Sequence, residues 1–141
     1  MKHILLIMLS LGVCACNSQT NVLPDDELTG VWIETSAQKD TLIFNLDHKG
    51  NSLPKTLTVK RGREINAGGY LVPKIGSGLY KYEFITSGDR SGRIDVINLL
   101  SSFSGSTDYA FQRKGNQIEV ENFFELGFNK PATATRTLIR L

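Results

Sequence analysis

Thiol and imidazole side chains are few in this sequence: two cysteines, Cys14 and Cys16, and two histidines, His3 and His48. A thiolate can be a nucleophile or a metal ligand, and an imidazole can move protons or bind metal. Cys14, Cys16 and His3 all lie near the amino terminus, in or beside an apolar run. This placement points to processing or attachment chemistry at the start of the chain.

The first residues have the pattern of a secretory signal. Lys2 supplies a positive charge, and residues 4–13 form an apolar run that is broken only by Ser10 and Gly12. The run is too short to span a bilayer, which needs about 20 apolar residues. We therefore expect residues 1–15 to be a signal helix that is cleaved and not kept as an anchor.

The end of this segment resembles the lipobox of bacterial lipoproteins: an aliphatic residue, a tolerant position, a small residue and the cysteine that receives lipid. Val13 and Ala15 place Cys16 in that last position. The alternative frame, ending at Cys14, puts the branched Val13 where a small residue is preferred. The resemblance implies a diacylglycerol thioether on Cys16 and a further acyl chain, because one chain anchors only marginally. An ordinary secretory signal with incidental cysteines is the other reading.

The resemblance also implies a location. Asn17 follows the cysteine, and in many Gram-negative bacteria an Asp there retains a lipoprotein in the inner membrane. We expect a cell-envelope protein held in the outer membrane by lipid on Cys16. Residues 16–27 are polar and without periodicity, as in a flexible tether.

Several function classes are disfavoured by composition. Of 16 Lys and Arg residues only Lys2 is in the signal, so 15 remain against 14 Asp and Glu, and we expect no nucleic-acid partner. Once Cys14 is removed and Cys16 lipidated, no thiol is left, and His48 alone cannot make a multi-histidine metal site. We expect no cofactor, no metal and no enzymatic activity.

Two weak catalytic alternatives stay open. His48 adjoins Asp47, but no Gly-x-Ser-x-Gly motif accompanies the pair, and a solvent-facing turn is favoured. Glu119 and Glu121 share one face of an expected strand, and carboxylate pairs for glycoside hydrolysis are set by space, not by sequence.

Residues 28–141 are typical of an all-β domain. Short apolar runs alternate with Gly-, Asn- and Asp-rich turns, which predicts an antiparallel meander of about eight strands closed into a barrel or a sandwich, and the resemblance given below favours a small barrel. The expected strands are 31–35, 41–46, 55–60, 70–72, 79–85, 93–99, 109–112, 117–123 and 133–141, with 61–69 and 101–107 as loops. Leu42, Phe44 and Leu46 are expected to share the buried face of the second strand.

The start of this domain resembles a lipocalin-like barrel, a family that opens its first strand with Gly-x-Trp, as Gly30 and Trp32 do here. The resemblance implies that Trp32 plugs the closed end of the barrel and that an Arg of the last strand lies over its ring. Arg140 is favoured over Arg136 for that role. Small lipocalin-like lipoproteins of the Bacteroidetes combine a signal of this style with such a domain.

An aromatic stripe of Tyr80, Tyr82 and Phe84 lies on one face of the strand over 79–85. It is either core or the wall of a pocket for one small apolar ligand. The expected function is therefore a membrane-anchored, non-enzymatic envelope lipoprotein that binds a small apolar ligand. The alternative is a protein-interaction module, a subunit or inhibitor of an envelope complex, acting through loops such as 61–69, 86–92 and 101–106. The basic residues at 60–63 are either solvated or in contact with anionic lipid headgroups.

Overall fold

The computed structural model describes residues 25–36, 40–86, 92–102, 105–125 and 134–141. The expected signal peptide and most of the tether, with both cysteines, lie outside these residues. Within them, no helix is long and apolar enough to cross a bilayer.

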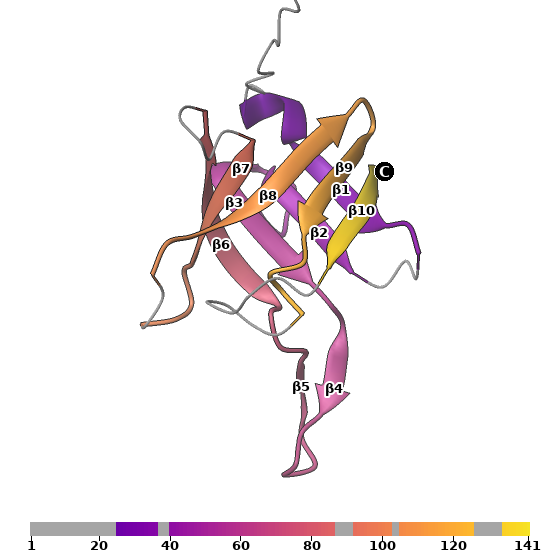
Figure 1. The fold of residues 1–141 in the computed structure, drawn as a ribbon. Helices are drawn as coiled ribbons and strands as arrows, with labels where there is room; N and C mark the ends of the chain where they lie inside the picture. The colour runs from indigo at the N-terminus through magenta and orange to yellow at the C-terminus, as the bar shows by residue number, and fades with distance from the viewer. Residues whose placement is uncertain (1–24, 37–39, 87–91, 103–104, 126–133) are drawn as a thin grey trace, which may run out of the picture.

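The described chain forms a closed barrel in which neighbouring strands are antiparallel (Figure 1). Eight strands close it in the order β1-β10-β9-β8-β7-β6-β3-β2, and β4 and β5 form a separate two-stranded sheet. The predicted all-β meander closed into a small barrel is confirmed. The elements are η1 (Asp25–Leu28), β1 (Gly30–Glu34), β2 (Thr41–Leu46), β3 (Ser52–Lys60), β4 (Arg63–Ile65), β5 (Leu71–Pro73), β6 (Gly78–Ile85), β7 (Arg93–Asn98), β8 (Thr107–Lys114), β9 (Gln117–Glu121) and β10 (Thr135–Arg140).

Alternation along the strands fills the barrel. Successive side chains of a strand point to opposite faces, so every second residue reaches the interior. All eight barrel strands contribute to the buried apolar core, together with residues from η1 and from the chain after β9. Its members are Leu28, Trp32, Leu42, Phe44, Leu57, Val59, Tyr80, Tyr82, Ile94, Val96, Tyr109, Phe111, Ile118, Val120, Phe123, Phe124 and Leu138.

A β-bulge in β2 changes the expected face of one residue. The pairing of β2 with β3 shifts between Phe44 and Leu46, and Asn45 between them has a φ of 58°. Asn45 is buried, whereas Leu46 is only half-buried. The extra residue of a bulge breaks the two-residue period, so Leu46 does not follow Leu42 and Phe44 into the core as alternation predicted.

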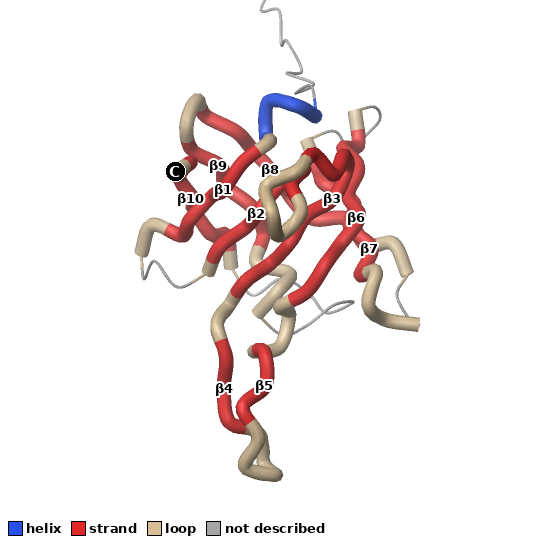
Figure 2. Tube along the Cα trace, turned by 180° about the vertical axis from the view of Figure 1, so that it is seen from behind, coloured by secondary structure: helices blue, strands red, loops and turns tan. Residues whose placement is uncertain are grey.

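The barrel has two distinct ends. The register pairs Gly30 with Phe44 at one end and Thr41 with Lys60 at the other. The first end is covered by η1. From the second end the chain between β3 and β6 projects as a two-stranded arm, residues 61–77, which points away from η1 in both views (Figures 1 and 2).

The arm departs from the prediction of a loop over 61–69. Arg63, Glu64 and Ile65 pair with Pro73, Val72 and Leu71, and a turn at 66–70 joins the two strands. The three-residue strand β4 has no apolar alternation, because neither of its faces is buried. The pattern that identifies strands in the barrel is therefore missing here.

Candidate functional site

The η1 end of the barrel is closed by Trp32. Its ring is fully buried, and its Nε1 donates a hydrogen bond of 2.8 Å to the carbonyl of Leu28 in η1. Arg140, the cross-strand neighbour of Trp32, places its Cζ 5.9 Å from the ring centroid and also donates to the carbonyl of Thr29. Gly30 leaves room for this guanidinium, since a Cβ there would lie 3.3 Å from Arg140 Nε, and its φ of +137° is unfavourable for other residues.

Arg136, the other candidate for the tryptophan, is at the opposite end of β10. Its Nη1 lies 3.2 Å from Glu34 Oε1 and its Nη2 lies 3.3 Å from Glu125 Oε2. Glu34 is buried and also accepts a hydrogen bond from Ser36. This polar cluster is not visible in the sequence, because Glu34 takes an interior position that alternation reserves for apolar residues.

The aromatic stripe lies in the core. Tyr80 and Tyr82 are buried and Phe84 is half-buried against the same cluster. The Tyr82 hydroxyl donates to Asn45 Oδ1 at 3.0 Å, and its ring meets that of Phe44 edge-on at 5.2 Å. The side chains of the stripe are thus packed against neighbouring side chains, and the Tyr82 hydroxyl makes its hydrogen bond inside the protein.

Tyr80 points toward the arm end. Its hydroxyl donates to the carbonyl of Gly76 at 2.8 Å, and its ring packs edge-on against Phe123. Burial, with a smaller contribution from Tyr109, raises the pKa of Tyr80 to about 12. The phenol therefore stays protonated well above neutral pH, in the form that donates this hydrogen bond to Gly76.

A pH dependence of stability follows for Tyr80→Phe. Near neutral pH the wild type should be more stable by about 0.5–1.5 kcal/mol, the net value of one hydrogen bond. Because the pKa of Tyr80 is raised in the folded state from 10.0 to about 12, the unfolded chain loses its proton first, and this advantage should shrink between those two pH values. Urea denaturation of both proteins at pH 7 to 11.5 measures it. A difference that stays constant up to pH 11.5 would contradict the assignment.

Arg61 closes the arm end of the barrel. Its Nε lies 3.3 Å from Asp40 Oδ1, and its Nη1 donates to the carbonyls of Ile75 at 2.9 Å, Phe124 at 2.9 Å and Glu125 at 3.2 Å. The guanidinium also lies 5.7 Å from the centroid of the Phe124 ring. One side chain therefore ties the start of the arm, its end and the chain after β9 together.

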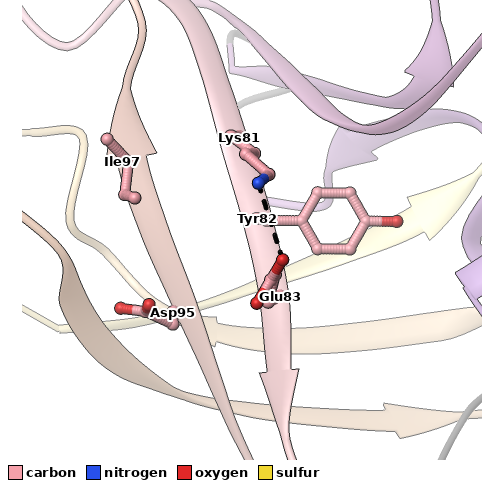
Figure 3. Close-up of a pocket in the computed structure, with 5 residues that line it drawn as sticks. All are labelled: Lys81, Tyr82, Glu83, Asp95 and Ile97. Atoms are coloured by element: carbon pink, nitrogen blue, oxygen red, sulfur yellow. Dashed lines mark ion pairs between the residues drawn. The ribbon is translucent and has the colours of Figure 1, made fainter.

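A shallow pocket lies on the outer wall, between β6 and β7 (Figure 3). It has a volume of about 80 Å³ and is lined by Lys81, Tyr82, Glu83, Asp95 and Ile97. Lys81 Nζ pairs with Glu83 Oε1 at 3.6 Å across it, while the ring of Tyr82 points away from both residues (Figure 3). Pockets for drug-sized ligands measure about 300–1,000 Å³, so this one is small for such a ligand.

The catalytic alternatives do not assemble into a site. His48 is exposed, and the Asp47 carboxylate accepts hydrogen bonds from the backbone of Lys49 and from Asn51. The hydrogen bonds from Asn51 lower the pKa of Asp47, so this carboxylate shapes the turn. No three His, Cys, Asp or Glu side chains gather as a metal site within the residues given above.

The two strand carboxylates each have basic partners. Glu119 lies 3.2 Å from Lys114 Nζ. Glu121 accepts a hydrogen bond from the backbone N–H of Ala110 at 2.6 Å and pairs with Arg93 at 3.3 Å. Both carboxylates therefore take part in pairing along β7, β8 and β9.

Large apolar side chains are exposed on the arm. The exposed fractions are 72% for Ile65, 72% for Tyr70, 54% for Leu71 and 58% for Ile75. Leu100 is also exposed and lies near the base of the arm, 3.5 Å from where a Cβ on Gly78 would be.

The basic stretch at 60–63 has two kinds of residue. The Arg61 side chain is held in the closure of the barrel, whereas Lys60, Gly62 and Arg63 are exposed.

No family model, curated protein or solved structure matches the chain.

Proposed function

We propose that this protein is a lipid-anchored, non-enzymatic protein of the bacterial cell envelope, and that its barrel is a protein-interaction module. The single observation that carries the second part is the contrast between inside and outside. The interior positions of the strands are occupied by the protein's own side chains, whereas large apolar side chains are exposed on the arm. Large apolar side chains gathered in exposed positions on one projecting element favour an interaction site.

The closures of the barrel support the same proposal. Trp32 with Arg140 covers one end, and Arg61 with Phe124 covers the other. A ligand in the interior would have to displace buried rings such as Tyr82, whose hydroxyl is held by Asn45. Displacing well-packed core side chains typically costs several kcal/mol, so the alternative of an apolar ligand inside the barrel is disfavoured energetically.

The anchor is supported by the lipobox-like residues and is tested with matched cysteine variants. Cys16→Ser should release the protein from the membrane fraction, because the acyl chains attach to that sulfur and about 0.8 kcal/mol per buried CH₂ is lost with them. Cys14→Ser should leave it membrane-bound. Fractionation of cells and metabolic labelling with a fatty acid measure both effects. Equal behaviour of the two variants would overturn the proposed anchor at Cys16.

The interaction role and the small-ligand role predict different masses. In native mass spectrometry from detergent, the purified protein should show only the mass of the lipidated polypeptide, because the protein's own side chains occupy the interior of the barrel. A constant additional mass of small-molecule size would support the small-ligand role instead. Outer-face substitutions such as Lys81→Ala provide a control, since they should leave the spectrum unchanged apart from their own mass.

A further inference from the structure

We propose that the arm, residues 61–77, is the docking element of this protein and that its partner is a protein with an apolar groove rimmed by acidic residues. This inference rests on the proposed interaction function and adds the binding surface and the chemistry of the partner.

The apolar side chains of the arm form a surface that only a partner can cover. Ile65 and Leu71 are paired across the two strands, so they lie side by side on one face of the arm. Both are more than half exposed, as are Tyr70 near the turn and Ile75 near the base. Tyrosine is enriched at the core of protein interfaces and among their energetic hot spots, and Ile65 and Leu71 add exposed apolar area on the same arm.

The arm is held in one orientation. At its base the N–H of Lys74 donates to the carbonyl of Gly62 at 3.1 Å. Arg61 and Tyr80 donate to the carbonyls of Ile75 and Gly76, which links the arm to the barrel. An isolated two-stranded hairpin is marginally stable, so these bonds fix a segment that buries little of its own apolar surface. Such preorganisation lowers the entropic cost of binding.

The charge of the arm sets the chemistry of the partner. Lys60, Arg63 and Lys74 lie on it or at its base, against one carboxylate, Glu64. Among the described residues, none of these three cations forms an ion pair, whereas the fourth cation, Arg61, is neutralised by Asp40. An arm that carries exposed apolar side chains and an excess of unneutralised positive charge is complementary to a groove with an acidic rim.

A membrane surface fits the arm less well. The turn at its tip is polar: Asn66 Oδ1 accepts hydrogen bonds from the N–H groups of Gly68 and Tyr70, each at 3.0 Å. Insertion in lipid would bury this polar turn before it buried Ile65 or Leu71. The arm also points away from η1, the end next to the expected tether (Figures 1 and 2). A second copy of the chain fits less well too, because two arms would bring like charges together.

Photo-crosslinking in the native host tests the inference with the full-length, anchored protein. A benzoylphenylalanine at Tyr70 is compared with one at His48, which is exposed at the opposite end. The expected result is one dominant protein adduct from position 70, with the attached peptide containing apolar residues flanked by Asp or Glu, and none from position 48. Leu71→Ser should reduce its yield about tenfold, as loss of an interface anchor does. Ile65→Ser, on the same face, should act in the same direction.

Charge reversal provides the matched control. Lys60→Glu should weaken the crosslink several-fold, and more strongly at low salt. Lys49→Glu, at a lysine that is also exposed but lies near the other end, should leave it unchanged. Equal effects of the two reversals, an adduct of the chain with itself, or an adduct on lipid would each overturn the inference. If position 70 gives no adduct but a probe at His48 or Lys81 captures a protein, the arm is not the docking element, and the proposed interaction function stands. If none of the three positions captures a protein, both fail.

Discussion

Replacing Arg61 by Ala is expected to lower the free energy of unfolding by about 3–5 kcal/mol, the usual cost of removing one partner of a buried ion pair. Asp40 would be left buried without its cation, and the carbonyls of Ile75 and Phe124 would each lose a donor. Urea denaturation followed by the fluorescence of Trp32, the single tryptophan of the chain, measures the loss.

Arg63→Ala is the matched control. Arg63 is exposed and its Nη2 makes one hydrogen bond, of 3.0 Å, to the carbonyl of Leu71. Its removal should cost less than about 1 kcal/mol. Similar losses for the two variants would mean that Arg61 does not hold the barrel closed.

A double-mutant cycle of Arg61→Met and Asp40→Asn separates the contribution of charge from that of packing. If Arg61→Met lowers stability because it leaves the Asp40 carboxylate without its cation, Asp40→Asn should cost less in the Arg61→Met background than in the wild type. The difference is the coupling energy of the pair. A coupling energy near zero would assign the effect to the three carbonyl contacts and to the ring of Phe124.

The barrel was predictable from the sequence because its strands bury one face each. Tyr80, Tyr82 and Phe84 alternate with Lys81 and Glu83, and that two-residue period is the physical signature of a half-buried strand. The position of Trp32 near Arg140 was likewise expected, since a resemblance based on Gly30 and Trp32 includes it. The strand faces follow from a local pattern that a single sequence contains, whereas the contact between Trp32 and Arg140 was expected only from the resemblance.

The closure of the arm end was not predictable. Arg61 lies in a basic stretch that is indistinguishable in composition from a solvated loop, and its carbonyl partner Phe124 is far away along the chain. Asn45 was not predictable for the same reason. Its buried amide forms hydrogen bonds with Thr29, Lys55 and Tyr82 only because a bulge turns it inward. Polar groups satisfied by contacts with residues distant in the sequence leave no periodic pattern in it.

This distinction also bears on the arm. Ile65 lay within the predicted loop over 61–69, because neither face of its strand is buried and so no alternation marks it. Tyr70 and Leu71 fell in the short strand predicted over 70–72, but nothing in the pattern marked them as exposed. The same absence of burial is what makes the arm available to a partner. Sequence pattern thus reports the surfaces that the domain covers itself, and it is weakest for a surface that only another molecule would cover.

Gly76→Ala tests how tightly the arm is set on the barrel. A Cβ on Gly76 would lie 1.7 Å from the carbonyl oxygen of Phe124, which is backbone and cannot rotate away as a side chain can. Gly69, at the tip of the arm, is the matched control: its φ of +80° is nearly the same as the +81° of Gly76, but no atom lies within 4 Å of its Cβ position. Both substitutions place a Cβ on a residue with the same unfavourable φ, but only Gly76→Ala brings that Cβ against the carbonyl oxygen of Phe124.

Gly69→Ala should therefore cost about 1–2 kcal/mol, the penalty of a left-handed conformation for a residue with a Cβ. Gly76→Ala should cost about 2–5 kcal/mol, because overpacking against a fixed backbone adds about 1–3 kcal/mol to the same backbone penalty. The collision also separates the chain at Phe124 from the arm, so Gly76→Ala should speed hydrogen exchange at Ser77 and Lys74, whose N–H groups are bonded in the arm's base. Gly69→Ala should leave that exchange unchanged. Equal stability losses for the two variants would mean that the arm is free to move relative to the barrel, and the preorganisation on which the docking inference depends would be lost with it.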